Sequence, residues 1–182
     1  MKTALLVIDV QMALADEDAQ GAARSCPEAE DNISRLLTAF RNQGNMVVHI
    51  HHHALDPEDP FHAAAPGAAV QPVAAPLSGE AVIIKHSSSG FVGTALETEM
   101  RAAGIERLIL CGAVANFCVE STARSAGDLG FDTVYTSDAV WAYGLTGPDG
   151  SEHSPEQVHS VTLSNVQGEF ATVLSTEEVL GL

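Results

Sequence analysis

Ala4-Leu5-Leu6-Val7-Ile8-Asp9 is a continuous apolar run that ends in a carboxylate. Apolar runs of this length are typical of strands in a parallel sheet, which are buried on both faces. Downstream, residues 27–43 carry apolar side chains at three- and four-residue spacing, and Gly44 follows them, so an amphipathic helix is predicted there. A second apolar run at residues 46–50 then completes the first strand–helix–strand unit.

The same alternation of apolar runs and helical patterns continues along the rest of the chain. Strands are predicted at residues 4–8, 46–50, 81–84, 108–111, 133–135 and 171–174. Helices are predicted at residues 27–43, 94–103, 118–129, 155–165 and 176–180. This order predicts an α/β fold with three layers, α/β/α, around a Rossmann-like six-stranded parallel sheet. Since neither a repeat nor a domain boundary is visible, we expect residues 1–182 to form a single domain.

Two stretches, residues 51–79 and 143–154, show no periodicity of either kind. Loops of this length in a compact domain are usually lids or binding loops, although a plain surface excursion is an equally simple interpretation of the Ala- and Pro-rich part. We therefore expect these two stretches to shape any ligand pocket.

Acidic residues dominate the charge of the chain. Its 182 residues include 24 Asp and Glu against 8 Lys and Arg, which gives a formal net charge of −16. Binding to a phosphate backbone or an anionic bilayer requires a basic surface, so we expect neither nucleic acid nor a membrane as a partner. The first residues contain a short apolar run without a small-residue cleavage site, so we expect a cytoplasmic protein.

The cysteines are few and odd in number: Cys26, Cys111 and Cys118. They form no CxxC pair, which argues against both a disulfide framework and a structural zinc site. At least one thiol therefore needs another explanation.

Three reactive side chains follow the carboxyl ends of predicted strands, where ligands bind in open parallel sheets. Asp9 ends the first strand, Lys85 ends the third, and Cys118 follows the fourth through a six-residue turn. Taken singly, each is more often a solvated boundary residue or a small buried hydrophobe. Together they suggest an activated nucleophile, because a lysine and a helix N-terminus stabilise a thiolate and a carboxylate can carry its proton.

Four motifs carry a resemblance to a known family. They are LVIDVQ at 6–11, IKHSSSGFVGT at 84–94, GAVANFCVESTAR at 112–124 and SDA at 137–139. In this order and spacing the chain resembles the isochorismatase-like cysteine hydrolases, which include nicotinamidases and N-carbamoylsarcosine amidases. The resemblance covers nearly the whole chain and implies the sheet order 3-2-1-4-5-6.

The resemblance also implies a catalytic triad. Cys118 would attack an amide or ureide carbonyl to form a thioester, Asp9 would act as general base and then acid, and Lys85 would hold the two together. A cis peptide between Ala113 and Val114 is implied, with the backbone N–H groups of Val114 and Cys118 directed at the oxyanion.

The presence of Cys118 favours hydrolysis of a C–N bond in a small amide or ureide over isochorismate cleavage. A vinyl-ether or ester hydrolase using the same pocket, and a non-catalytic member of the family, remain alternatives. Candidate substrate-binding residues, interpreted equally well as core or loop residues in several cases, are Gln11, His52, Phe91, Asn116 and Trp141.

No cofactor is expected. The nicotinamidases of the family carry an Asp-x-His metal motif, but the matching positions here are His52 and Ala54. Imidazoles are nevertheless good metal ligands, so the histidine-rich residues 49–53, with His62, leave a metal site open as an alternative. Members of the family often form dimers or tetramers, and we expect a homo-oligomer.

Overall fold

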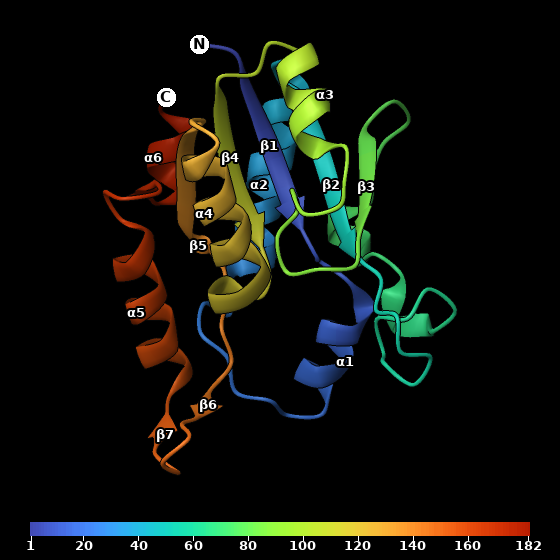
Figure 1. The fold of residues 1–182 in the computed structure, drawn as a ribbon, viewed down its shortest axis with the longest axis vertical. Helices are drawn as coiled ribbons and strands as arrows, with labels where there is room; N and C mark the ends of the chain where they lie inside the picture. Colours follow the sequence, from blue (N-terminus) through green and yellow to red (C-terminus); the bar gives the residue numbers. More distant parts are fainter.

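The computed structural model describes all residues from 1 to 182 and contains a six-stranded parallel sheet (Figure 1). The strand order is β3-β2-β1-β4-β5-β8, which confirms the predicted order, with β8 as the sixth predicted strand. The strands are β1 (Thr3–Ile8), β2 (Met46–His52), β3 (Ala81–Lys85), β4 (Arg107–Gly112), β5 (Asp132–Val140) and β8 (Thr172–Leu174).

Helices cover both faces of this sheet, so the predicted three-layer α/β/α architecture is confirmed. They are α1 (Met12–Ala19), α2 (Ala29–Asn42), α3 (Leu96–Ala102), α4 (Glu120–Asp128), α5 (Pro155–Val166) and α6 (Thr176–Leu180). One core layer contains buried side chains of α2 and α6, and the other contains those of α3, α4 and α5.

Strand β1 shows why the central runs are continuously apolar. Leu5 and Val7 pack in the core layer that contains α2, whereas Leu6 and Ile8 pack in the layer on the opposite face. Side chains alternate between the faces of a strand, so a strand covered on both sides needs apolar residues at every position. Burial on both faces removes more apolar surface from water per residue than burial on one.

The structure adds elements that the sequence pattern did not predict. Helix α1 follows β1 directly, and residues 143–154 contain a hairpin of β6 (Leu145–Thr146) and β7 (Glu152–His153). The predicted loop 51–79 contains two short 3₁₀ helices, Pro66–Ala68 and Pro72–Ala74.

Two predicted boundaries also change. A π-helical turn, Ala115–Val119, precedes α4, so the helical segment predicted to begin at 118 begins earlier. Strand β5 runs to Val140, five residues beyond its predicted end at 135, because it continues past a register shift in its pairing with β4. No helix is both long and apolar enough to cross a membrane.

All six strands run in parallel, so their carboxyl ends meet at one edge of the sheet. In Figure 1 this edge is the lower one, and α1 lies below it with the β6–β7 hairpin farther out. This arrangement places α1, the hairpin and the loop 51–79 around the edge where ligands are expected.

Candidate active site

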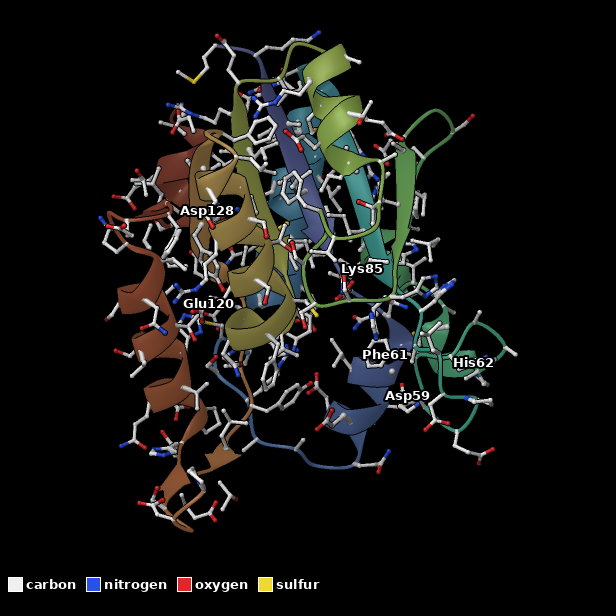
Figure 2. The ribbon with its side chains drawn as sticks, in the orientation of Figure 1. Asp59, Phe61, His62, Lys85, Glu120 and Asp128 are labelled. Carbon is white, nitrogen blue, oxygen red and sulfur yellow. The ribbon has the colours of Figure 1, made fainter.

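Asp9, Lys85 and Cys118 come together at the carboxyl edge of the sheet. Lys85 Nζ lies 2.7 Å from Asp9 Oδ2 and 3.3 Å from Cys118 Sγ, and its third hydrogen bond goes to the backbone oxygen of Ser87 at 3.1 Å. An ammonium has three N–H donors, so these contacts use all of them and fix its orientation. Figure 2 labels Lys85 beside the lower end of β3.

The backbone around the triad adopts two left-handed conformations. Asp9 leaves β1 with φ at +52°, a region that Asp tolerates better than most residues. Gly112 ends β4 with φ at +117°, where a Cβ atom would clash with the backbone of Ile8. The peptide bond between Ala113 and Val114 is cis, as the family resemblance implies. The chain can therefore turn tightly against β1 before it reaches Cys118.

A cavity of about 350 Å³ opens beside the thiol. Its volume is in the range that small-molecule sites occupy. Helix α1, the loop after β2, the turn before α4 and the segment after β5 all contribute to its lining. The lining residues are Asp9, Leu14, Glu17, His52, Phe61, Ala113, Val114, Asn116, Phe117, Cys118, Tyr143, Gly144 and Leu145.

Several buried polar groups that line this cavity have no partner within the protein. The backbone N–H of Val114 makes no hydrogen bond. Asp9 Oδ1, His52 Nδ1 and Asn116 Oδ1 are buried and equally unpaired. Buried polar groups are normally satisfied, so unpaired groups that surround one cavity indicate a polar ligand that would pair with them.

Burial, and secondly the neighbouring Asp9 charge, raise the pKa of the Cys118 thiol to about 12 against the opposing effect of Lys85. The direction is opposite to the one expected from the lysine and the helix N-terminus. The physical reason is that desolvation of a buried sulfur outweighs one ammonium that is already paired with a carboxylate. Burial also raises the pKa of Asp9, while the Lys85 charge and hydrogen bond lower it.

Two of the candidate substrate-binding residues, His52 and Asn116, line the cavity. The imidazole of His52 packs edge-to-face against Phe61, with the ring centroids 5.7 Å apart. Burial lowers the pKa of His52, and the charge of Lys85 lowers it further, so the ring is neutral at physiological pH.

Gln11 does not reach the cavity, contrary to its candidate role. It is fully buried, and its side chain pairs with both the backbone N–H and the backbone oxygen of His52 and donates to the oxygen of Ala68. The Gln11 side-chain amide thus pairs with the backbone of His52 at the point where β1 has ended and its backbone pairing with β2 stops. Gln11 holds the segment that carries His52 and contacts no ligand space.

Phe91 and Trp141 are also removed from the lining. Phe91 stacks on Phe131 with the ring centroids 6.0 Å apart, because the loop between β3 and α3 folds back over the sheet into the core (Figure 1). Trp141 is fully buried, and its indole Nε1 donates to the hydroxyl of Tyr143, which itself lines the cavity. Both aromatics are core residues, the alternative interpretation of their sequence positions.

Eight lining residues were not predicted as site residues: Leu14, Glu17, Phe61, Ala113, Phe117, Tyr143, Gly144 and Leu145. Leu14 and Glu17 lie on α1, whose weak apolar periodicity hid the helix. One signal was available, since residues 12–19 contain strong helix formers without Gly or Pro. Phe61 lies on the loop that also carries Asp59 and His62, as labelled in Figure 2. Neither Phe61 nor Tyr143 had a periodic context that could place it.

The histidine-rich strand end is divided between the two faces of the sheet. His49 and His51 share one face, with ring centroids 6.3 Å apart, and His49 Nε2 lies 2.8 Å from Glu80 Oε2. His52 points instead into the cavity. No three or more His, Cys, Asp or Glu side chains are grouped so that they could hold a metal ion.

Comparisons with known proteins give a consistent result. The model of the isochorismatase domain matches residues 3–178. The chain is 34% identical to the uncharacterized isochorismatase family protein YrdC of Bacillus subtilis, over 98% of this chain and 95% of that protein. It is 34% identical to the ureidoacrylate amidohydrolase RutB of Acinetobacter baylyi, over 56% of this chain and 38% of that protein. The crystal structure of a cysteine hydrolase from Pseudomonas syringae superposes with a TM-score of 0.90 at 28% identity, covering 99% of this chain and 91% of that one.

Proposed function

This chain belongs to the isochorismatase family of hydrolases, and we propose that it hydrolyses a C–N bond of a small amide or ureide through a thioester on Cys118. The observation that carries the proposal is the position of Lys85, whose ammonium contacts both the Asp9 carboxylate and the Cys118 sulfur. The proposed nucleophile, Cys118, and its proton acceptor, Asp9, thus both contact the Lys85 ammonium beside a small cavity.

In the first half-reaction the Cys118 sulfur bonds to the substrate carbonyl carbon while its proton passes to Asp9. The carbonyl π electrons move onto oxygen, and the unpaired N–H of Val114 is a donor available to that oxyanion. When the tetrahedral intermediate collapses, the C–N bond breaks and the nitrogen takes the proton from Asp9. Ammonia or an amine leaves, and the acyl group remains on sulfur.

In the second half-reaction a water molecule attacks the thioester and gives a proton to Asp9. The C–S bond breaks, the proton returns to sulfur, and a carboxylic or carbamic acid leaves. Burial raises the pKa of the Cys118 thiol, which favours proton transfer to Asp9 during attack, and Lys85 contacts both groups and so offsets the negative charge on either one. The cycle consumes one water and needs no oxidant, reductant or further co-reactant.

The unpaired atoms of the cavity support an amide over an ester. Asn116 Oδ1 is an acceptor, and the N–H groups of an amide or ureide are donors that an ester lacks. A site built to receive donors discriminates strongly against a ligand without them, because its own polar atoms then stay unpaired. The name of the relative RutB, an amidohydrolase, agrees with this choice.

The test is release of ammonia from a panel of small amides, ureides and carbamoyl amino acids, with the matching esters beside them. We expect turnover of amides by the wild type, none by Cys118→Ala, and an acyl adduct on Cys118 by intact mass when the reaction is quenched early. Circular dichroism of Cys118→Ala serves as the control for folding. Undiminished ammonia release by Cys118→Ala, or turnover restricted to esters, would overturn the proposal.

A further inference from the structure

Glu17 is an unpaired charge at the mouth of the cavity. It lies on α1, is exposed, and its side chain takes part in no ion pair or hydrogen bond within the protein. Two carboxylates close to it are compensated: Asp9 by Lys85, and Asp18 by Arg24 at 2.9 Å and by the Tyr143 hydroxyl at 2.8 Å. Glu17 is thus an uncompensated carboxylate that also lines the ligand space.

No basic side chain lines the cavity to balance Glu17. Lys85 and Arg24 are both engaged in ion pairs, and the imidazole of His52 is neutral. The chain as a whole carries a net charge of −16, which adds a diffuse attraction for cations. An anionic substrate would therefore meet unfavourable charge at the entrance.

Aromatic rings make up much of the remaining outer wall. Phe61, Phe117 and Tyr143 line the cavity together with Glu17. The ring of Tyr143 is held by two hydrogen bonds of its hydroxyl, from Trp141 Nε1 and to Asp18. Aromatic faces beside a carboxylate are the side chains that recognise ammonium, quaternary ammonium and guanidinium groups. The inner end of the same cavity carries the buried, unpaired Oδ1 of Asp9 beside the thiol.

We propose that the substrate is a cationic amide or ureide, whose positive group binds between Glu17 and the aromatic wall while its carbonyl carbon reaches Cys118. This inference rests on the proposed hydrolysis for its reaction and adds the charge of the substrate. Glu17 is then the residue that sets specificity, acting through binding of the cation.

Thiol labelling tests the charge preference without any substrate. Cationic, neutral and anionic methanethiosulfonates of similar size are reacted with Cys118 and quantified by mass spectrometry of its peptide. Each rate is divided by the rate with free cysteine, so the intrinsic reactivity of the reagents cancels. We expect the ratio of cationic to anionic rates to exceed one in the wild type and to be about three- to tenfold lower in Glu17→Gln. At high salt this difference between the two proteins should shrink, because mobile ions screen the Glu17 charge.

Asp16→Asn is the matched control, because it removes the same charge from an exposed position on α1 that does not line the cavity. We expect the labelling ratio to change little in this variant. A ratio that is unchanged in Glu17→Gln, or that falls equally in Asp16→Asn, overturns the assignment to Glu17.

Paired substrates test the same inference by turnover. Each pair consists of an amino-substituted amide and its neutral isostere, and KM is compared between wild type and Glu17→Gln. In the wild type we expect the KM of the cationic member to be about three- to tenfold lower than that of its neutral isostere. In Glu17→Gln we expect this difference between the two substrates to disappear. Equal KM values for the two members overturn the cation site while keeping the hydrolase. Absence of turnover with the labelling preference intact overturns the hydrolysis and supports the cation site.

Discussion

Lys85 forms its ion pair with Asp9 across a strand that lies between them. Lys85 is the last residue of β3 and Asp9 directly follows β1; both strands pair with β2 and not with each other, and yet Nζ lies 2.7 Å from Oδ2. Two strand spacings of about 4.8 Å each separate β1 from β3, a gap that needs the full length of a lysine side chain. His52 is the partner of Lys85 in the pairing of β2 with β3, so the lysine passes over the end of β2.

Replacement of Lys85 by methionine should keep the volume of the side chain and remove the ammonium. Its charge lowers the pKa of Cys118, and its charge and hydrogen bond lower that of Asp9, so without it both pKa values rise and a smaller fraction of each group is ionised at neutral pH. We expect alkylation of Cys118 by iodoacetamide at neutral pH to slow by roughly tenfold or more, and kcat/KM to fall by about a hundredfold. Unchanged alkylation would refute the electrostatic role. Cys26, labelled in the same sample, provides the internal reference.

The pH dependence of activity should report the raised pKa of Asp9. Asp9 must be ionised to accept the thiol proton, and burial raises its pKa above the ordinary value, so activity is lost on acidification at a higher pH than an exposed Asp would give. We expect the acid limb of kcat/KM to have its midpoint above about 4. Asp9→Asn should remove most of the activity, by roughly 10²–10⁴-fold. A midpoint at or below the ordinary Asp value contradicts the assignment, and circular dichroism at each pH controls for unfolding.

The sequence was sufficient to predict the sheet and the proximity of Asp9, Lys85 and Cys118, for a specific physical reason. Parallel strands covered on both faces need apolar residues at successive positions, and this requirement gives the central strands β1 and β4 continuous apolar runs. The strands end at one edge, so Asp9, Lys85 and Cys118 could be brought together by topology alone. Their separation along the chain, and the strand that lies between Asp9 and Lys85, did not affect that argument.

The cavity wall was harder to predict because it depends on packing between segments without periodicity. Gln11 and Trp141 have positions beside the site in the sequence, but hydrogen bonds to His52 and to Tyr143 turn both of them into the protein interior. Glu17 reaches the cavity only because α1 begins immediately after β1 and returns below the sheet edge (Figure 1). The direction in which a side chain of an irregular segment points depends on tertiary packing, and it cannot be predicted from the local sequence.

Gly112→Ala should be among the most destabilising single substitutions in the chain. Gly112 has φ at +117°, which L side chains rarely adopt, and a Cβ atom there would clash with the backbone of Ile8. We expect the free energy of unfolding to fall by more than about 3 kcal/mol, or folding to fail. Gly44→Ala is the control, since φ is +68° there and no atom lies within 4 Å of an added Cβ. That change should cost about 1 kcal/mol, so equal effects in urea denaturation would contradict the argument.

Glu80 ties the helix α2 to the sheet through a bidentate ion pair. Its carboxylate accepts from Arg41 Nε at 2.7 Å and from Arg41 Nη2 at 2.8 Å, and it contacts His49 Nε2 and the backbone N–H of Leu77 at 2.8 Å. The Glu80 side chain is only 13% exposed, so these contacts are poorly screened by solvent. They join α2, β2 and the segment that leads into β3.

Acid should therefore weaken the fold through Glu80. The hydrogen bonds from Arg41, with those from Leu77 and His49, lower its pKa to about 2 from an ordinary value of 4.5. A depressed carboxyl pKa stabilises the fold above the ordinary value, and the gain is lost as the pH falls from about 4.5 towards about 2. We expect Glu80→Gln to lower the free energy of unfolding by about 2–3 kcal/mol at neutral pH, with the difference from wild type shrinking through that window. Glu97→Gln, which breaks an exposed pair with Arg101, should change it by less than about 1 kcal/mol at any pH. A difference between Glu80→Gln and wild type that is independent of pH would show that the carboxylate charge does not stabilise the fold.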